Sequence, residues 1–509
     1  MARSPMATEP GSADDRPHAV VIGSGFGGLA AAVRLGARGY RVSVLERLAA
    51  AGGRAAMFEQ DGFRFECGPT IVTAPELFKE LWTLCGKRLA DDVELRALAP
   101  FYRLRFDDGT EFDWSGDQDA MRELVQRLAP DDVSGYERLM RYSEQVYRKA
   151  FEQLGHVPFG SWAGMLRIAP ALLRLRAYRS LHGVVASQVR NPKLRFLLSF
   201  HPLFVGGNPF TTSALYGLIL HLERTGGVHC AIGGTASLVR GLLGLIAGQG
   251  GQVRYGAGVR RILLEGRTAT GVQLDSGVEI AASVVVSNAD TAWTYQHLLP
   301  EKLRRRWSDR RLARARYSMS LFVWYFGTRC QYPDVRHHTI LVGPRYRELL
   351  RDIFERHILA DDFSLYLHRP TATDASLAPP GCDAFYVLSP VPNLSANVDW
   401  RTVAESYREK IARHLEATLL PKLRQNIVTS AIMTPLDFQD RLLSWRGAAF
   451  GMEPLLTQSA WFRPHNRAED FERLYLVGAG THPGAGLPGV LSSARVLDAV
   501  VPHGRTVAG

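Results

Sequence analysis

The stretch HAVVIGSGFGGL at residues 18–29, followed by VSVLE at 42–46, decides the fold of this chain. Residues 20–22 are apolar and β-branched, which predicts a buried parallel strand. Glycines at positions 23, 25 and 28 form G-x-G-x-x-G, which predicts a tight turn before a helix over residues 29–37. A second strand at 42–45 ends at Glu46, whose carboxylate can accept hydrogen bonds from ribose hydroxyls. The pattern predicts a Rossmann-like domain that binds a dinucleotide, rather than glycines that serve an ordinary turn.

The composition favours a large globular chain. The 509 residues are 46% hydrophobic, which suffices for two or three domains. No apolar run reaches about 18 residues, so no membrane-spanning helix is expected. The net charge of +11 is consistent with binding to an anionic surface, such as nucleic acid or a membrane. It is also consistent with a solvated, arginine-rich surface that has no partner. The polar residues 1–17 predict a flexible extension, not a signal peptide.

The cysteines point to a reducing compartment. Five of them are scattered along the chain, without C-x-x-C and without metal-ligand spacing to histidine. We therefore expect buried thiols, a cytoplasmic location and no metal site.

A second glycine-containing segment indicates which dinucleotide is bound. Residues 52–54, Gly-Gly-Arg, closely follow Glu46, so the backbone can approach phosphates and Arg54 can lie over them as a cation. This segment resembles the extended signature of the flavin-dependent amine oxidase and carotenoid desaturase superfamily, which implies FAD. In that superfamily the bend at residues 68–70, Gly-Pro-Thr, lies beside the flavin ring.

The last glycine-rich loop, GAGTHPGAGLPGV at 478–490, lies between a predicted strand at 474–477 and a helix to Val501. Its five glycines and two prolines hold backbone close to a ligand, and the helix start faces charge. With the end of a strand at 284–286, these segments supply the cofactor-binding candidates. They are Gly23, Ser24, Gly25, Gly27, Gly28, Glu46, Arg47, Gly53, Arg54, Gly68, Pro69, Thr70, Val259, Asn288, Gly480, Gly489 and Val490.

The order of patterns predicts one interrupted cofactor domain. The fold class is α/β: a Rossmann-like, two-dinucleotide-binding FAD domain with an inserted mixed α+β substrate domain. Its FAD-binding parts are expected at 18–97, 228–300 and 471–509, and its substrate parts at 98–227 and 301–470. Strands from the two substrate parts could form one sheet that floors a cavity.

Several segments resemble the bacterial-type phytoene desaturases, FAD enzymes of carotenoid biosynthesis, from about residue 18 to 500. The motifs are GGRAAMFEQDGFRFECGPT at 52–70, SFHPLFVGGNPFTTSALY at 199–216, HHTILVGPRYRELL at 337–350, DFSLYLHRP at 362–370, LTQSAWFRPHNR at 456–467 and GAGTHPGAGLPGV at 478–490. The first and last are shared widely among related flavoproteins, and the middle ones are more specific.

The resemblance implies the reaction. Phytoene would be desaturated stepwise toward neurosporene or lycopene, by hydride transfer to flavin N5 and loss of a proton. A quinone or oxygen would then reoxidise the flavin. Such a reaction calls for an apolar tunnel that orients the chain and excludes water, without nucleic acid or metal as partner.

Three residues are candidates near the chemistry: Arg167, His201 and His482. The family commonly has an acidic residue three positions before Arg167, where this chain has Gly164. This chain therefore has the arginine of the family at position 167 but lacks the acidic residue that usually accompanies it. A further departure is Cys230-Ala-Ile before the glycine pair at 233–234, where the family has an aromatic residue and a proline.

Residues 157–183, VPFGSWAGMLRIAPALLRLRAYRSLHG, combine apolar bulk with four arginines at 167, 174, 176 and 179 and no acidic residue. The pattern fits a helix in a membrane interface or a helix packed on the protein's own core. The polyene substrate favours the first, so we expect a helical membrane-facing region and peripheral association with the inner face of the cell membrane.

Other activities remain open at this point. They are a desaturase or isomerase of another carotenoid, a flavin amine oxidase, and a non-catalytic lipid carrier on the same fold. The intact flavin loops argue against the carrier, and no aromatic cage for an amine is found in the sequence.

Overall fold

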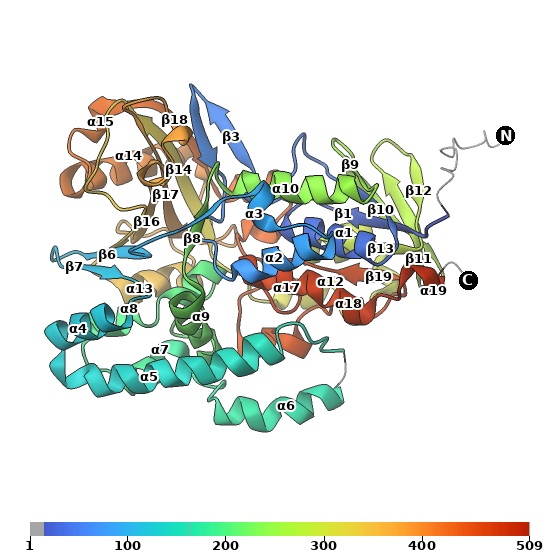
Figure 1. Ribbon diagram of the computed structural model, residues 1–509, viewed down its shortest axis with the longest axis horizontal. Helices are drawn as coiled ribbons and strands as arrows, with labels where there is room; N and C mark the ends of the chain where they lie inside the picture. Colours follow the sequence, from blue (N-terminus) through green and yellow to red (C-terminus); the bar gives the residue numbers. More distant parts are fainter. Residues whose placement is uncertain (1–14, 161, 508–509) are drawn as a thin grey trace.

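The computed structural model describes residues 15–160 and 162–507. Most of the expected N-terminal extension, residues 1–14, lies outside the described residues. Figure 1 shows two regions side by side, with the parallel sheet on the right and a larger mixed sheet on the left.

The parallel sheet confirms the predicted nucleotide-binding fold. Its strands β1 (His18–Ile22), β2 (Arg41–Leu45), β9 (Gln252–Arg254), β13 (Val284–Ser287) and β19 (Leu474–Leu476) have the order β19-β13-β1-β2-β9. Every pairing is parallel. Helix α1 (Phe26–Ala37) connects β1 to β2, as the glycine pattern predicts.

Two layers cover this sheet, and alternate residues of β1 face each of them. Ala19 and Val21 pack with helices α1, α2 (Pro75–Leu84), α10 (Thr235–Gly248) and α17 (Leu487–Arg495). Val20 and Ile22 pack toward the antiparallel strands β10 (Val259–Glu265), β11 (Thr268–Leu274) and β12 (Glu279–Ala281). This burial on both faces explains why β1 is an unbroken apolar run.

The second region is built on a seven-stranded sheet. Its order is β18-β14-β17-β16-β15-β6-β7, with β15 parallel to β6 and the other pairs antiparallel. The strands are β6 (Tyr102–Phe106), β7 (Glu111–Trp114), β14 (Ser320–Thr328), β15 (His338–Val342), β16 (Leu365–His368), β17 (Asp383–Val391) and β18 (Ile427–Met433). The single sheet drawn from two distant segments is confirmed, whereas β15 and β18 were not predicted.

Alternate residues of β14 face opposite sides of this sheet. Leu321 and Val323 point into the cluster that surrounds the cavity described below. Phe322 and Trp324 pack on the other side against α14 (Trp400–Thr418). The sheet therefore separates the cavity from an aromatic-rich helical cover.

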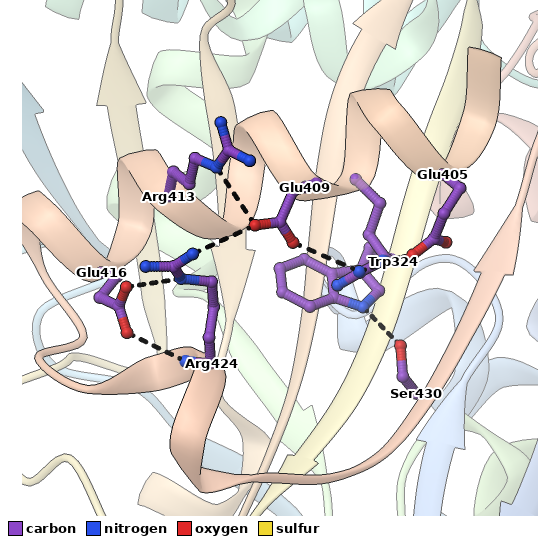
Figure 2. Close-up of polar contacts among 8 residues, drawn as sticks. Trp324, Glu405, Glu409, Arg413, Glu416, Arg424 and Ser430 are labelled. Carbon is purple, nitrogen blue, oxygen red and sulfur yellow. Dashed lines mark hydrogen bonds and ion pairs between the residues drawn. The ribbon is translucent and has the colours of Figure 1, made fainter.

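Ion pairs surround the contact between α14 and the sheet (Figure 2). Glu409 Oε1 meets Arg413 Nε at 3.2 Å and Arg424 Nη1 at 3.3 Å. The indole N–H of Trp324 donates to the Ser430 hydroxyl at 2.8 Å. The ion pairs are largely exposed and contribute little individually, so the buried aromatic contacts hold the helix.

A mostly helical block, which belongs to the first substrate segment, lies below the two sheets in Figure 1. It contains α4 (Gln118–Leu128), α5 (Val133–Val146), α6 (Trp162–Arg174), α7 (Leu181–Ala186), α8 (Pro192–Leu197) and α9 (Leu218–Gly226). Helix α6 forms the lower edge of the molecule in this view.

The remaining elements are short. The strand pairs are β3 (Met57–Gln60) with β4 (Phe63–Glu66), and β5 (Leu95–Ala97) with β8 (His229–Ala231). The helices are α3 (Leu89–Asp92), α11 (Thr291–Leu298), α12 (Asp309–Arg314), α13 (Tyr346–Arg351), α15 (Leu423–Asn426), α16 (Pro435–Asp440), α18 (Leu497–Val500) and α19 (Gly504–Val507). The Asp61-Gly62 turn joins β3 to β4. Among the described residues, no helix has the length and hydropathy needed to cross a bilayer.

Candidate functional site

A cavity of about 990 Å³ joins the two sheets. One end is lined by the loops that follow β1, β2, β13 and β19, where the carboxyl ends of the parallel strands meet. The other end is lined by β14, β15, β16 and β17 of the seven-stranded sheet. Ligands of open α/β sheets bind at these strand ends, so the cavity connects a nucleotide site to a second compartment.

The glycine-rich turn is held in place by contacts that exclude side chains. A Cβ atom on Gly28 would lie 2.0 Å from the carbonyl oxygen of Gly23, and one on Gly27 would lie 2.5 Å from Oδ1 of Asn288. Asn288 follows β13, and its side chain packs against the turn from the neighbouring strand. The N-terminal N–H groups of α1 therefore stay aimed at the cavity, where they suit an anion.

Glu46 lies at the end of β2 and is buried. Its Oε2 accepts hydrogen bonds from the Ser24 amide at 2.9 Å and the Ser24 hydroxyl at 2.6 Å, and its Oε1 accepts from the Leu48 amide at 2.8 Å. These bonds fix the carboxylate at the cavity wall, in the position where such folds bind a ribose.

Arg54 shows that the site fits an anionic group. Its Nη2 donates to the Ser444 hydroxyl at 2.8 Å, while its buried Nε has no hydrogen-bond partner among the described residues. Burial lowers the pKa of Arg54, and the neighbouring Asp290 carboxylate opposes that shift. A buried donor that lacks a partner at the wall of a glycine-lined cavity fits a pyrophosphate.

The bend at residues 68–70 lies against the seven-stranded sheet. Thr70 Oγ1 is hydrogen-bonded to the Tyr366 hydroxyl at 2.8 Å, and the Tyr386 hydroxyl donates to the Gly68 carbonyl at 3.2 Å. Both tyrosines line the cavity. The sheet thereby holds the bend between the nucleotide end and the second compartment.

His482 in the C-terminal glycine-rich loop also lines the cavity. Its Nε2 lies 3.1 Å from the Leu154 carbonyl, which can only accept, so Nε2 carries the proton. Burial lowers the pKa of His482 to about 4. The ring is therefore neutral at physiological pH, and its Nδ1 is an unprotonated acceptor.

The second compartment is lined mainly by apolar side chains. Its wall includes Leu203, Phe204, Leu321, Val323, Ile340 and Phe450. The carboxylate of Glu223 also reaches this wall, but it accepts a hydrogen bond from Tyr102 at 2.8 Å and lies 3.2 Å from His201 Nε2. A compartment of this kind suits a long apolar ligand with few polar groups.

Helix α6 closes one side of the second compartment. Met165, Ile168 and Leu172 line the cavity at helical spacing. Trp162, Leu166 and Leu173, on another face of α6, are 53%, 60% and 63% exposed. The helix thus presents apolar side chains both to the cavity and to the outside.

Most of the predicted cofactor residues lie together. Fifteen of the seventeen line the cavity. The exceptions are Gly28, which packs α1 on β1, and Gly480, where a Cβ atom would lie 2.3 Å from Thr291 Oγ1. Both glycines permit close packing behind the wall.

The three residues predicted near the chemistry are dispersed. His482 lines the cavity, whereas Arg167 and His201 lie outside the wall that the described residues form. Arg167 is exposed on α6, and His201 is fully buried behind Glu223. A catalytic role for these two residues stays a prediction without support from their placement.

Sequence reasoning missed residues that complete the nucleotide end. Asp290 and Trp293 line the cavity at the start of α11, and Asp290 accepts hydrogen bonds from the amides of Ala292 at 2.9 Å and Trp293 at 3.2 Å. Their position directly after β13 could have identified them, since parallel strands end at the ligand. Arg441, which also lines the cavity, follows α16 and carries no comparable local signal.

Comparisons with known proteins agree with this architecture. A family model described as flavin containing amine oxidoreductase matches residues 26–496. A neurosporene-forming phytoene desaturase from Cereibacter sphaeroides is 48% identical over 495 residues, which cover 96% of this chain and 95% of that relative. A lycopene-forming phytoene desaturase from a Paracoccus species is 48% identical over 484 residues, which cover 95% and 97%.

Solved structures show the same fold. A redesigned putrescine oxidase superimposes with a TM-score of 0.65, covering 95% of this chain and 98% of its own, at 14% sequence identity. At that identity the likeness concerns the fold alone.

Proposed function

Because the chain belongs to the bacterial phytoene desaturases of the flavin-containing amine oxidoreductase family, we propose that it desaturates phytoene to neurosporene or lycopene with FAD as cofactor. The observation that carries the proposal is the continuous cavity, which joins a nucleotide site to an apolar compartment. A polyene in that compartment can extend toward the bend at residues 68–70, where the two ends of the cavity meet.

The nucleotide end holds the cofactor through residues of both glycine-rich segments. Glu46 would hold the adenosine ribose, Arg54 and the start of α1 would hold the pyrophosphate, and residues 68–70 would contact the flavin. Bound FAD supplies the acceptor for the two electrons that leave with each new double bond.

The chain's own residues orient the hydrocarbon and receive a proton. Apolar walls exclude water from a substrate that carries positive charge during the reaction. His482 is the group at the wall that is suited to accept the proton, because its imidazole is neutral and Nδ1 is unprotonated. Arg167 and His201 are not placed to accept this proton, because both lie away from the cavity wall.

Product analysis tests the function. Purified chain loaded with FAD is supplied with phytoene in liposomes and a quinone, and the products are followed by absorption and chromatography. We expect polyenes with red-shifted absorption, with neurosporene or lycopene as end product. Unchanged phytoene with flavin bound would favour another carotenoid or an amine as substrate, and absence of bound flavin after loading would favour a lipid carrier.

Helix α6 supports peripheral membrane association. Nine large hydrophobic side chains are exposed among the residues that the structure describes, and four of them, Trp162, Leu166, Leu173 and Tyr178, lie on α6 or just after it. Arg167 and Arg174 are exposed beside them and can reach anionic lipid headgroups. Since the inner face of α6 lines the cavity, a helix lying in the interface would bring the membrane to the substrate compartment.

Replacing Leu166 and Leu173 together with glutamate should weaken binding to anionic liposomes by at least about tenfold. Burial of a leucine side chain contributes roughly 1.5–3 kcal/mol, and the two new carboxylates are also repelled by the anionic headgroups. Liposome co-sedimentation measures the effect. The control replaces Ile358 and Val428, which are 51% and 43% exposed, with glutamate. Equal binding of the α6 variant and this control would contradict docking through α6.

Three further expectations stay proposals. The division into FAD-binding parts at 18–97, 228–300 and 471–509 and substrate parts at 98–227 and 301–470 follows the two sheets in outline. A quinone or oxygen reoxidises the cofactor. The chain acts in the cytoplasm at the inner face of the cell membrane.

A further inference from the structure

Three histidines form a buried cluster behind the cavity, at the edge shared by β15 and β16. His338 and His368 lie directly opposite each other in the antiparallel register of these strands, so their side chains project from the same face. His337 immediately precedes β15. All three are buried, with exposed fractions of 8% for His337, 1% for His338 and 2% for His368.

The rings converge on one another. Their centroids are 4.5, 4.9 and 5.2 Å apart, and each residue offers one nitrogen within 4.8 Å of the other two. Nε2 of His337 lies 3.2 Å from Nε2 of His368. Tetrahedral zinc with bonds of about 2.0–2.1 Å sets its nitrogen ligands about 3.3 Å apart. The nitrogens of His337 and His368 therefore already have the spacing of two zinc ligands. The nitrogen of His338 lies within 4.8 Å of them and must approach by at most roughly 1.5 Å.

In two of the three histidines, the nitrogen that faces away from the cluster is anchored by a hydrogen bond. Nδ1 of His337 is 2.7 Å from the Thr373 hydroxyl, and Nδ1 of His338 is 2.6 Å from the Tyr366 hydroxyl. Metal-binding histidines carry such a bond on the opposite nitrogen, because it fixes the ring and its tautomer. Nε2 of His338 is buried and has no hydrogen-bond partner among the described residues.

A carboxylate lies beside one ring of the cluster, that of His368. Oε2 of Glu66, at the end of β4, lies 3.8 Å from Nε2 of His368. Its Oε1 accepts a hydrogen bond from the Thr235 amide at 2.7 Å, which leaves Oε2 toward the histidines. The four side chains come from β4, β15 and β16 and the residue before β15.

The electrostatics of the cluster also suit a cation. Burial lowers the pKa of His337 to about 3 and those of His338 and His368 well below their ordinary value. All three imidazoles are therefore neutral, which is the form that binds metal ions. Burial raises the pKa of Glu66 to about 7, and no arginine or lysine among the described residues forms an ion pair with its carboxylate.

We propose that His337, His338, His368 and Glu66 bind one Zn²⁺ ion as a structural site. Three imidazoles and one carboxylate match the donor set and coordination number that zinc prefers. The ion would tie the β3–β4 hairpin to the edge of β15 and β16. Through the Tyr366 hydroxyl it would also stiffen the bend at residues 68–70, without entering the cavity.

Metal analysis of the full, FAD-loaded chain without an affinity tag tests the site. After incubation with Zn²⁺ and gel filtration, we expect about one zinc per chain, and a melting temperature that falls when a chelator is added. His368→Ala should lose the ion, while a His357→Ala/His503→Ala control, at two exposed histidines, should retain it. Co²⁺ in place of Zn²⁺ should give visible ligand-field bands in the parent chain and in the control, but not in His368→Ala.

A milder variant keeps the test decisive if His368→Ala does not fold. Thr373→Val removes only the hydroxyl that anchors His337, so we expect zinc affinity to fall about 10–100-fold with the fold retained. Parent chain without retained zinc, or zinc held equally by His368→Ala, would overturn the proposal. The cluster would then be a group of neutral, packed histidine rings, of which His338 is hydrogen-bonded to the Tyr366 hydroxyl.

Discussion

Replacing Gly28 with alanine should leave the chain without bound FAD. The new Cβ atom would lie 2.0 Å from the Gly23 carbonyl oxygen and 3.1 Å from Cβ of Asn288. The first contact is with backbone on the neighbouring turn, so α1 can accommodate the methyl group only by moving away from β1. That movement displaces the N–H groups that face the pyrophosphate, and we expect FAD affinity to fall more than about 100-fold.

The ratio of flavin absorbance to protein absorbance after purification with excess FAD measures this loss. Gly244→Ala is the matched control, because Gly244 lies in α10 and its Cβ atom would meet nothing within 4 Å. That change should leave the flavin content unchanged and raise the free energy of unfolding by about 0.5–1 kcal/mol. Parental flavin content in Gly28→Ala would show that the turn tolerates a side chain and that the predicted phosphate site is wrong.

Replacing Asp383 with alanine should destabilise the seven-stranded sheet by about 3–5 kcal/mol. Asp383 begins β17 and is fully buried. Its carboxylate accepts hydrogen bonds from Arg369 Nε at 2.9 Å, the Tyr332 amide at 2.7 Å and the Thr371 hydroxyl at 2.6 Å. Alanine would leave the buried Arg369 guanidinium without its counter-ion and two donors without an acceptor.

Thermal unfolding followed by circular dichroism measures this effect, with an expected fall in melting temperature of roughly 5–10 °C. Asp361→Ala removes a carboxylate that pairs with Lys410 at 2.6 Å but is 97% exposed, so it should leave the melting temperature unchanged. Equal melting temperatures for the two variants would mean that the buried network adds nothing to stability.

The sequence by itself predicted the nucleotide-binding half in detail. The strand–turn–helix at residues 18–37, Glu46 and Arg54 are all where the pattern places them. The physical reason is that these signals are local: glycine conformation, β-branched runs and helix starts depend on a few neighbouring residues. The ends of parallel strands then converge by topology, which brings the separate loops to one cavity.

The remaining features of the fold depend on contacts between segments that lie far apart in the sequence. Strand β15 pairs with β6, more than 200 residues earlier in the chain, and nothing in its five residues specifies that partner. Helix α6 was predicted as amphipathic, but only packing shows that Met165 lines the cavity while Leu166 and the candidate Arg167 face outward. Burial depends on what covers a residue, and that information lies far away in the sequence.

The histidine cluster shows the same division most clearly. Adjacent residues 337 and 338 with a third histidine at 368 have no metal-ligand spacing, so the sequence alone predicts no metal site. The pairing of His338 opposite His368 brings these two rings together with that of His337, and Glu66 at the end of β4 lies 3.8 Å from the ring of His368. The sequence determined which residue types are present, and only the tertiary structure decided which of them meet, because strand register and burial set the distances between donors.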